Sequence, residues 1–171
     1  MHTKQGRSWT VIAATSLMTL SLFAASGSAG ADRELARDWT LRGVDGVPLN
    51  FFQHAADRPV VLLFWATWCP YGRALMPHLE KLRQEFAQDE VNFYALNIWD
   101  DGDPVAYMTD NDYGSHLLLK ADEVAKTYGV MGTPGLFVVD TDRVVRYERK
   151  AGSSPTQVES DVGFVLGNLA R

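Results

Sequence analysis

Two mainly apolar runs stand out along this chain of 171 residues. The first, "PVVLLFWAT" at 59–67, and the second, "VNFYALNIW" at 91–99, are both rich in β-branched and aromatic side chains. Strict alternation of apolar and polar residues would indicate a strand with one solvent-exposed face, whereas runs of this kind are typical of strands buried on both faces. The pattern therefore predicts two central strands of a covered sheet.

The segment that follows the first run changes to a helical period. From Pro70 onward, apolar residues recur at three- and four-residue spacing with charged residues between them, which predicts an amphipathic helix that Pro77 should kink. A second amphipathic pattern begins at Pro155 and closes the chain. The residues expected to face the core are Leu75, Leu79, Leu82 and Phe86 in the first helix and Val158, Val162, Val165, Leu166 and Leu169 in the second.

Shorter patterns fill the remaining chain. Residues 38–52 predict two short strands around a turn at Asp45-Gly46, and residues 135–152 predict a hairpin that turns at Thr141-Asp142. Between the second run and this hairpin, the pattern predicts a helix at 104–110, a strand at 115–120 and a helix at 122–130. The first strand–helix–strand unit implies parallel pairing with a right-handed crossover, and the hairpin adds antiparallel strands. We therefore predict an α/β fold with a mixed central sheet and helices on both faces.

The first residues have the features of a secretory leader. Lys4 and Arg7 make the start mildly basic, an uncharged apolar run follows at 9–25, and the small residues Ala29 and Ala31 fit a cleavage site. This order predicts a signal peptide at 1–31, cut after Ala31, and one exported, periplasmic domain at 32–171. An uncleaved anchor helix is the alternative, although the run is short for a bilayer, which needs ~20 apolar residues. Membrane contact is expected only through such an uncleaved leader.

Charge and cysteine content narrow the chemistry of the domain. The formal net charge is −5, and both Lys4 and Arg7 lie in the leader, so the rest of the chain is more acidic still. A negative surface argues against nucleic acid or anionic lipid as partner. Cys69 is the only cysteine, so no internal disulfide can form. In an oxidising compartment, such a thiol is either buried and inert or available to another molecule.

Three segments carry a family likeness. "FWATWCPYGRALMP" at 64–77 resembles the active-site segment of thioredoxin-fold proteins, in particular the exported TlpA/ResA-type thiol–disulfide oxidoreductases. "VDGVPLNF" resembles the hairpin that precedes the core in that group, and "YGVMGTPGLFVVDTDRVV" resembles the loop, strand and turn around the family's cis-proline. The resemblance covers the chain from Asp38 onward. It implies a thioredoxin-like fold and thiol–disulfide chemistry.

The chain departs from the family pattern at one position. The family has Cys-x-x-Cys, whereas this sequence reads Cys69-Pro70-Tyr71-Gly72, so glycine replaces the resolving cysteine. A thiolate at a helix start is favoured by the first-turn N–H groups and can attack a disulfide to form a mixed disulfide. Gly72 cannot release that adduct. We therefore predict an atypical, monothiol protein whose adducts with protein clients or glutathione are resolved by an outside thiol.

The resemblance also assigns roles to residues around the cysteine. It implies Pro134 as the cis-proline beside Cys69, with Thr133 before it as part of the client-docking edge. Trp68 would shape the docking surface. An acidic residue near the family's active cysteine can exchange protons with it, and Asp100 is the candidate here. Asp101 is a rival for that role, and a solvated turn carboxylate is the alternative.

Other functions remain open at this stage. A redox-inert binding or chaperone-like module would use the same groove to hold a peptide, and an assembly role in cytochrome or copper-enzyme maturation is a further alternative. The histidines, such as His54, His78 and His116, have no metal-ligand spacing. We therefore expect no metal and no cofactor.

Overall fold

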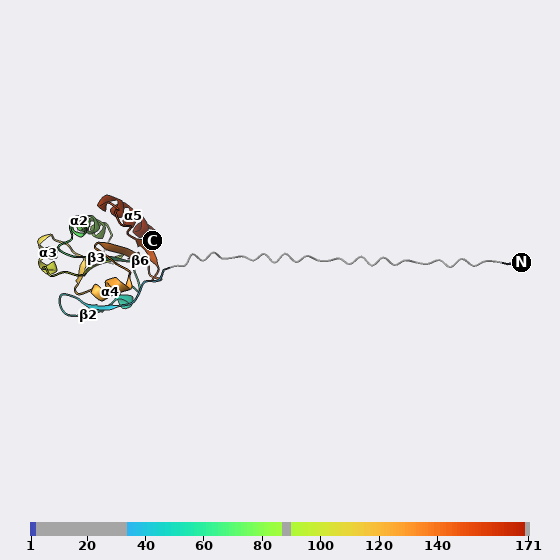
Figure 1. The fold of residues 1–171 in the computed structure, drawn as a ribbon, viewed down its shortest axis with the longest axis horizontal. Helices are drawn as coiled ribbons and strands as arrows, with labels where there is room; N and C mark the ends of the chain where they lie inside the picture. Colours follow the sequence, from blue (N-terminus) through green and yellow to red (C-terminus); the bar gives the residue numbers. More distant parts are fainter. Residues whose placement is uncertain (3–33, 87–89, 170–171) are drawn as a thin grey trace. The chain divides into compact units, whose positions relative to one another are not determined.

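The apolar runs form the middle of a five-stranded sheet (Figure 1). β3 (Val60–Trp65) pairs in parallel with β4 (Asn92–Asn97) and antiparallel with β6 (Gly135–Val139). β5 (His116–Leu118) extends the sheet beyond β4, and β7 (Val145–Glu148) extends it beyond β6. The strand order is therefore β5-β4-β3-β6-β7, with β3 at the centre.

Helices α2 (Pro70–Glu85) and α5 (Pro155–Leu169) cover one face of this sheet (Figure 1). They contact every second residue of β3, because successive side chains of a strand point to opposite faces. The shared core contains Val61, Leu63 and Trp65 of β3, Leu75, Leu79 and Leu82 of α2, and Val158, Val162 and Leu166 of α5. The predicted core residues Phe86, Val165 and Leu169 are partly buried at the margin of this cluster.

The alternate residues of β3 face the other side of the sheet. There they join a core with α4 (Asp122–Thr127) and with the hairpin of β1 (Thr40–Arg42) and β2 (Pro48–Asn50). A short helix, α1 (Phe51–His54), follows β2 at a place where the sequence pattern predicted extended chain. The side chain of the preceding asparagine caps α1, and this local hydrogen bond competes successfully with the strand.

The α/β class with helices on both faces of a mixed sheet is thus confirmed. The helix predicted at 104–110 forms as α3 (Pro104–Asp110), capped by the side chain of Asp103, which accepts from the Ala106 N–H. The helix predicted at 122–130 is shorter and ends at Thr127. In each case the type of element is as predicted, and the differences lie at the ends.

The computed structural model describes residues 1–2, 34–86 and 90–169. The predicted signal peptide and its cleavage site lie outside the described residues, apart from the first two. Residues Asp32–Arg171 form one compact unit. None of the helices within the described residues combines the length and apolar content that a membrane crossing requires.

A buried ionic cluster fastens α2 to the loop before β5. Glu80 is only 8% exposed, and its carboxylate accepts from Arg83 Nη2 at 2.7 Å, from Gln84 Nε2 at 3.0 Å and from the Gly114 N–H at 3.0 Å. Burial alone would raise the pKa of Glu80, but the hydrogen bonds from Arg83, Gly114 and Gln84 outweigh it and hold the pKa below 4.5. The ionised carboxylate is therefore the form that stabilises this junction.

We expect Glu80→Gln to lower the free energy of unfolding by about 2 kcal/mol at pH 7, because Arg83 loses its charged partner. The folded-state pKa is depressed, so the contribution of Glu80 is present above its ordinary value of 4.5 and is lost as the pH falls below it. Urea unfolding at pH 7 and pH 4 measures both effects. Glu85→Gln, which removes an exposed carboxylate from the same helix, is the control and should change stability little. An equal loss for the two variants would contradict the assignment.

Candidate active site around Cys69

Cys69 occupies the N-cap position of the sixteen-residue helix α2. Its backbone is extended, and its side chain makes no capping hydrogen bond. Pro70 is the first helical residue and has no N–H, so the N–H groups of Tyr71 and Gly72 form the free donor end of the helix. These donors and the helix dipole stabilise negative charge on an atom at the N-cap. The fold therefore places the only thiol at the donor end of a helix.

The loop before β6 lies directly against the cysteine. Cys69 Sγ donates a hydrogen bond to the Thr133 carbonyl oxygen at 3.4 Å, and the Thr133–Pro134 peptide bond is cis. Arg149 Nη1 donates to the Pro134 carbonyl oxygen at 3.3 Å, so β7 and the chain after it help to hold this loop. Residues 64 positions apart in the sequence are thereby brought into contact.

The cysteine itself is nearly covered, because only 3% of Cys69 is exposed. The position of the missing second cysteine is buried beside it. An ideal Cβ built on Gly72 would lie 3.8 Å from Cys69 Cβ and 4.0 Å from Cys69 Sγ, and 3.7 Å from Trp65 Cβ. All three separations are ordinary van der Waals distances, so Gly72 is not required by crowding.

Large exposed side chains lie next to Cys69 in the sequence and in the loop that contains Thr133. Trp68 is 55% exposed, Tyr71 is 72% exposed and Met131 is 94% exposed. Trp68 is nevertheless fixed, because its Nε1 donates to the Trp99 carbonyl oxygen at 2.8 Å. Trp65, in contrast, lies fully in the core against Tyr107. The exposed rings give the surface around the thiol the apolar character typical of a protein contact site.

Asp100 follows β4 and ties together the ends of two parallel strands. Its carboxylate accepts from Thr67 N and Thr67 Oγ1, each at 2.6 Å, from Asn97 Nδ2 at 2.6 Å and from the Gly102 N–H at 3.0 Å. Burial raises the pKa of Asp100, but these hydrogen bonds outweigh it and hold the pKa below 3.8. Gly102 must be glycine for this approach, since an added Cβ would lie 2.3 Å from Thr67 Oγ1.

This geometry bears on the predicted proton relay. Among the described residues, the hydrogen bonds of Asp100 connect it to Thr67 in the loop before Cys69 and to Asn97 and Gly102, and none connects it to the thiol. A carboxylate held below its ordinary pKa by four donors exchanges protons poorly near neutral pH. The proton-relay role of Asp100 stays a prediction, and its contacts support an anchoring role.

Arg73, four residues after Cys69, places its guanidinium over the Tyr107 ring, 5.6 Å from the centroid.

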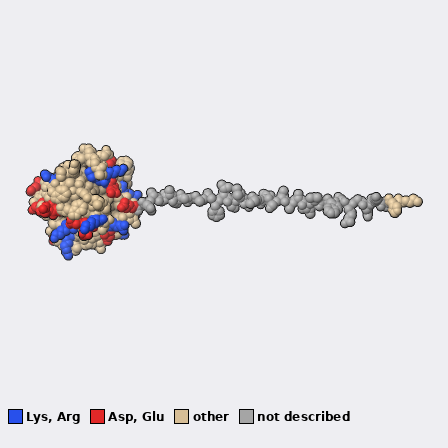
Figure 2. Space-filling model, in the orientation of Figure 1, with Lys and Arg blue, Asp and Glu red and all other residues tan. Residues whose placement is uncertain are grey.

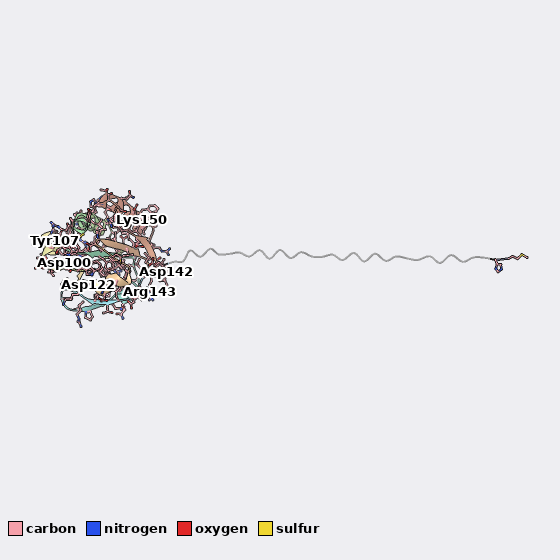
Figure 3. The ribbon with its side chains drawn as sticks, viewed as in Figure 1. Asp100, Tyr107, Asp122, Asp142, Arg143 and Lys150 are labelled. Atoms are coloured by element: carbon pink, nitrogen blue, oxygen red, sulfur yellow. The ribbon has the colours of Figure 1, made fainter. Side chains whose placement is uncertain are left out.

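Sequence reasoning missed the partners of Asp100 and the aromatic residue before it. Thr67, Asn97, Trp99 and Gly102 all lie where β3 and β4 end, and the carboxyl ends of adjacent parallel strands meet at one edge of a sheet. This rule could have placed Thr67 near Asp100. Figure 3 shows Asp100 at the same end of the domain as Asp122 and Tyr107, and Asp142 and Arg143 at the opposite end.

A comparison with known families decides the classification, because residues 33–148 match the model of the AhpC/TSA family. The chain belongs to the AhpC/TSA family. Within this family, it is 30% identical over 115 residues to the thioredoxin-like protein YneN of Bacillus subtilis, covering 65% of this chain and 66% of that protein. It is 31% identical over 103 residues to the thiol-disulfide oxidoreductase ResA of Bacillus thuringiensis, covering 58% of this chain and 59% of that protein.

These alignments span less than two thirds of either relative. Among solved structures, a thioredoxin family thiol:disulfide interchange protein from Chlorobium tepidum superposes with a TM-score of 0.69 at 18% identity. The superposition covers 84% of this chain and all of that structure. The thioredoxin-like fold implied by the resemblance is thereby confirmed, as is the kinship with ResA-named proteins. Among the described residues, no three His, Cys, Asp or Glu side chains are grouped to hold a metal.

Proposed function

We propose that this chain is an exported monothiol member of its family that exchanges thiols and disulfides through Cys69. The observation that carries the proposal is the position of Cys69 at the N-cap of α2, with Sγ 3.4 Å from the carbonyl oxygen of the cis Thr133–Pro134 peptide. The free donors of the helix start stabilise negative charge at the N-cap, the position of the attacking residue. The apolar rings around it supply a surface on which a client can dock.

The chemistry is one balanced exchange. The Cys69 thiolate attacks one sulfur of a client disulfide, a new S–S bond joins Cys69 to that sulfur, and the other client sulfur leaves as a thiolate. No electrons are gained or lost overall. Because Gly72 offers no second thiol, an external thiol must attack the adduct and release Cys69. Glutathione, a second protein or another cysteine of the client can supply it.

Docking and location complete the proposal. Thr133 and Pro134 would form the edge against which an extended client segment lies, and Trp68 would cover one side of it. The signal peptide at 1–31, cut after Ala31, would deliver the domain to the periplasm. One structurally similar protein is a secreted disulfide oxidoreductase of Mycobacterium tuberculosis, and another is an exposed lipoprotein thioredoxin of Streptococcus pneumoniae. The location of both proteins agrees with an exported role for this chain.

A second candidate is a redox-inert module that binds a peptide with the same surface. The observation that favours it is the 3% exposure of Cys69, because buried structural cysteines are unreactive. The two functions share the docking surface and differ only in whether the sulfur reacts. Access to Cys69 is therefore the quantity to measure.

The test is to trap adducts of the tagged protein in its exported compartment. Cells are quenched with acid and an alkylating reagent, and non-reducing gels compare the parent chain with Cys69→Ser. We expect adducts that need Cys69 and disappear with reductant, because no internal thiol can resolve them. Their identity distinguishes protein clients from glutathione and shows whether the clients belong to cytochrome or copper-enzyme maturation.

Alkylation of the purified protein separates the two candidates. Reaction of Cys69 with iodoacetamide in the folded protein is compared with the reaction in urea. Absence of adducts, together with a folded-state rate at least about 1,000-fold slower than in urea, would overturn the exchange function and favour the binding module. Adducts with a measurable folded-state rate would exclude the inert module.

A further inference from the structure

A cavity of about 680 Å³ opens beside the residue that precedes the cysteine. Its walls include the rings of Trp68 and Trp99, with Pro104 beside them. Trp68 directly precedes Cys69, and consecutive Cα atoms are about 3.8 Å apart. The cavity therefore begins at the residue next to the cysteine that would attack a client disulfide. Cys69 itself does not line it, so the cavity is distinct from the cysteine and the loop at Thr133.

Both tryptophans are exposed, and hydrogen bonds hold the Trp68 ring and the Trp99 backbone. Trp68 is 55% exposed and donates from Nε1 to the Trp99 carbonyl oxygen, while Trp99 is 39% exposed and its backbone N–H donates to Asp122 Oδ1 at 2.9 Å. The first bond keeps the Trp68 ring at the surface, which removes part of the ordering cost when a ligand binds it. Indole faces are also the best aromatic partners for a cation.

The charge of the cavity is negative. Asp100, Asp101 and Asp122 line it, and Lys120 is the one cation among its lining residues. Asp100 stays ionised at neutral pH, because its hydrogen bonds hold its pKa below 3.8. Asp101 is exposed. Acidic atoms gather at the end of the domain where α3 lies (Figure 2), and Figure 3 places Asp100 and Asp122 at that end.

From these observations we propose that the cavity receives a lysine or arginine side chain of the client protein, and so selects client cysteines that have a basic residue nearby. This proposal rests on the proposed exchange function and adds a client class to it. The apolar stem of a lysine would lie between the indole rings, and its ammonium group would meet the carboxylate of Asp101. An aliphatic side chain at the same place would keep only the contact of its stem with the rings, and an acidic one would be repelled by the carboxylates of the cavity.

The test uses short neutral peptides with one cysteine activated as a mixed disulfide with thiopyridine. Cys69 attacks the peptide sulfur, the peptide becomes joined to Cys69, and thiopyridine leaves and is followed by its absorbance. A lysine is placed at one to four residues on either side of the cysteine, with norleucine and glutamate at the same places as matched controls. We expect the best lysine peptide to react about fivefold to tenfold faster than its norleucine counterpart and faster still than the glutamate peptide.

Variants assign the preference to the cavity. Asp101→Asn should reduce the lysine preference about threefold, and Trp99→Leu should remove most of what remains. Asp110→Asn removes one charge from the exposed side of α3, outside the cavity, and should leave the preference unchanged. Raising the salt concentration should weaken the preference more in the parent chain than in Asp101→Asn, which keeps Asp100 and Asp122 but loses one charge.

The two levels of the proposal fail in different ways. Dithiodipyridine carries no lysine, so its reaction with Cys69 reports thiol exchange alone. If it gives no adduct, the exchange function itself is wrong. If it reacts while no lysine position gives more than a twofold advantage, or if Asp110→Asn has the same effect as Asp101→Asn, the exchange function stands and the cavity does not select basic clients.

Discussion

Replacing Gly72 with cysteine is expected to convert a thiol that can only form adducts into a dithiol that closes a disulfide and releases reduced client. An ideal Cβ at this position lies 3.8 Å from Cys69 Cβ. Disulfide-bonded cysteines have Cβ atoms about 3.8 Å apart on average. The backbone of α2 therefore already holds the geometry that a bridge between these two positions needs.

The substitution should also be tolerated by the fold. The nearest atoms to the added Cβ, besides those of Cys69, belong to Trp65 at 3.7 Å. Glycine inside a helix is destabilising relative to residues with a side chain, so Gly72→Cys should not weaken α2. What changes is chemistry: the introduced thiolate can attack the Cys69–client bond, release the reduced client and leave a disulfide in the protein.

The measurement is reduction of a protein disulfide by stoichiometric amounts of the pre-reduced chain with no other thiol present, because dithiothreitol would itself resolve the Cys69 adduct. We expect Gly72→Cys to release reduced client and to end as an internal disulfide, whereas the parent chain stays joined to at most one equivalent of client. Gly72→Ser is the matched control, because it adds a side chain of similar size without a thiol. Mass spectrometry of the oxidised variant should show two fewer hydrogens and no alkylation.

One result would show that the inferred geometry is incorrect. If oxidised Gly72→Cys keeps two alkylatable thiols while the folded protein is as stable as Gly72→Ser, the two positions are not placed for a bridge. If the disulfide forms but no reduced client is released, the protein does not bind this client at the site. These outcomes separate the local geometry at α2 from the docking surface that Trp68 and Thr133 are proposed to supply.

The fold could be predicted from the sequence because its determinants are periodic and local. The apolar run at 59–67, rich in β-branched and aromatic residues, favours a strand covered on both sides, and the three- to four-residue period after Pro70 favours a helix packed on it. The helix α1 was missed because it depends on one capping hydrogen bond from Asn50, which overrides the extended pattern of its neighbours. A single capping residue is a weak signal in a sequence, although in the structure it can determine whether a short helix forms.

In the candidate site, too, local features could be predicted from the sequence and long-range contacts could not. The position of Cys69 before a helix is a local feature, and its likeness to a known motif could be seen directly. The network around Asp100 could not be seen, because Thr67 is 33 residues away and the contact exists only through the parallel pairing of β3 and β4. The cavity between Trp68 and Trp99 has the same origin, since those two residues are 31 positions apart.

The network around Asp100 leads to the second large effect. Asp100→Ala is expected to lower the free energy of unfolding by about 2–4 kcal/mol at pH 7, because four donors lose one charged acceptor. The folded-state pKa is depressed, so this contribution is complete above the ordinary value of 3.8 and is lost as the pH falls below it. Urea unfolding at pH 7 and pH 3 measures the difference, which should shrink at the lower pH.

A double-mutant cycle with Thr67→Val assigns the loss to the anchor. Thr67→Val removes only the hydroxyl donor and should cost about 1 kcal/mol, and the two substitutions together should cost less than the sum of the single losses. A further variant, Asp100→Asn, decides between anchor and proton relay. If Asp100 anchors the loop before Cys69, Asp100→Asn lowers stability and leaves the pH dependence of Cys69 alkylation unchanged. A shift of that profile by about one pH unit with unchanged stability would instead make Asp100 the relay that the family resemblance implies.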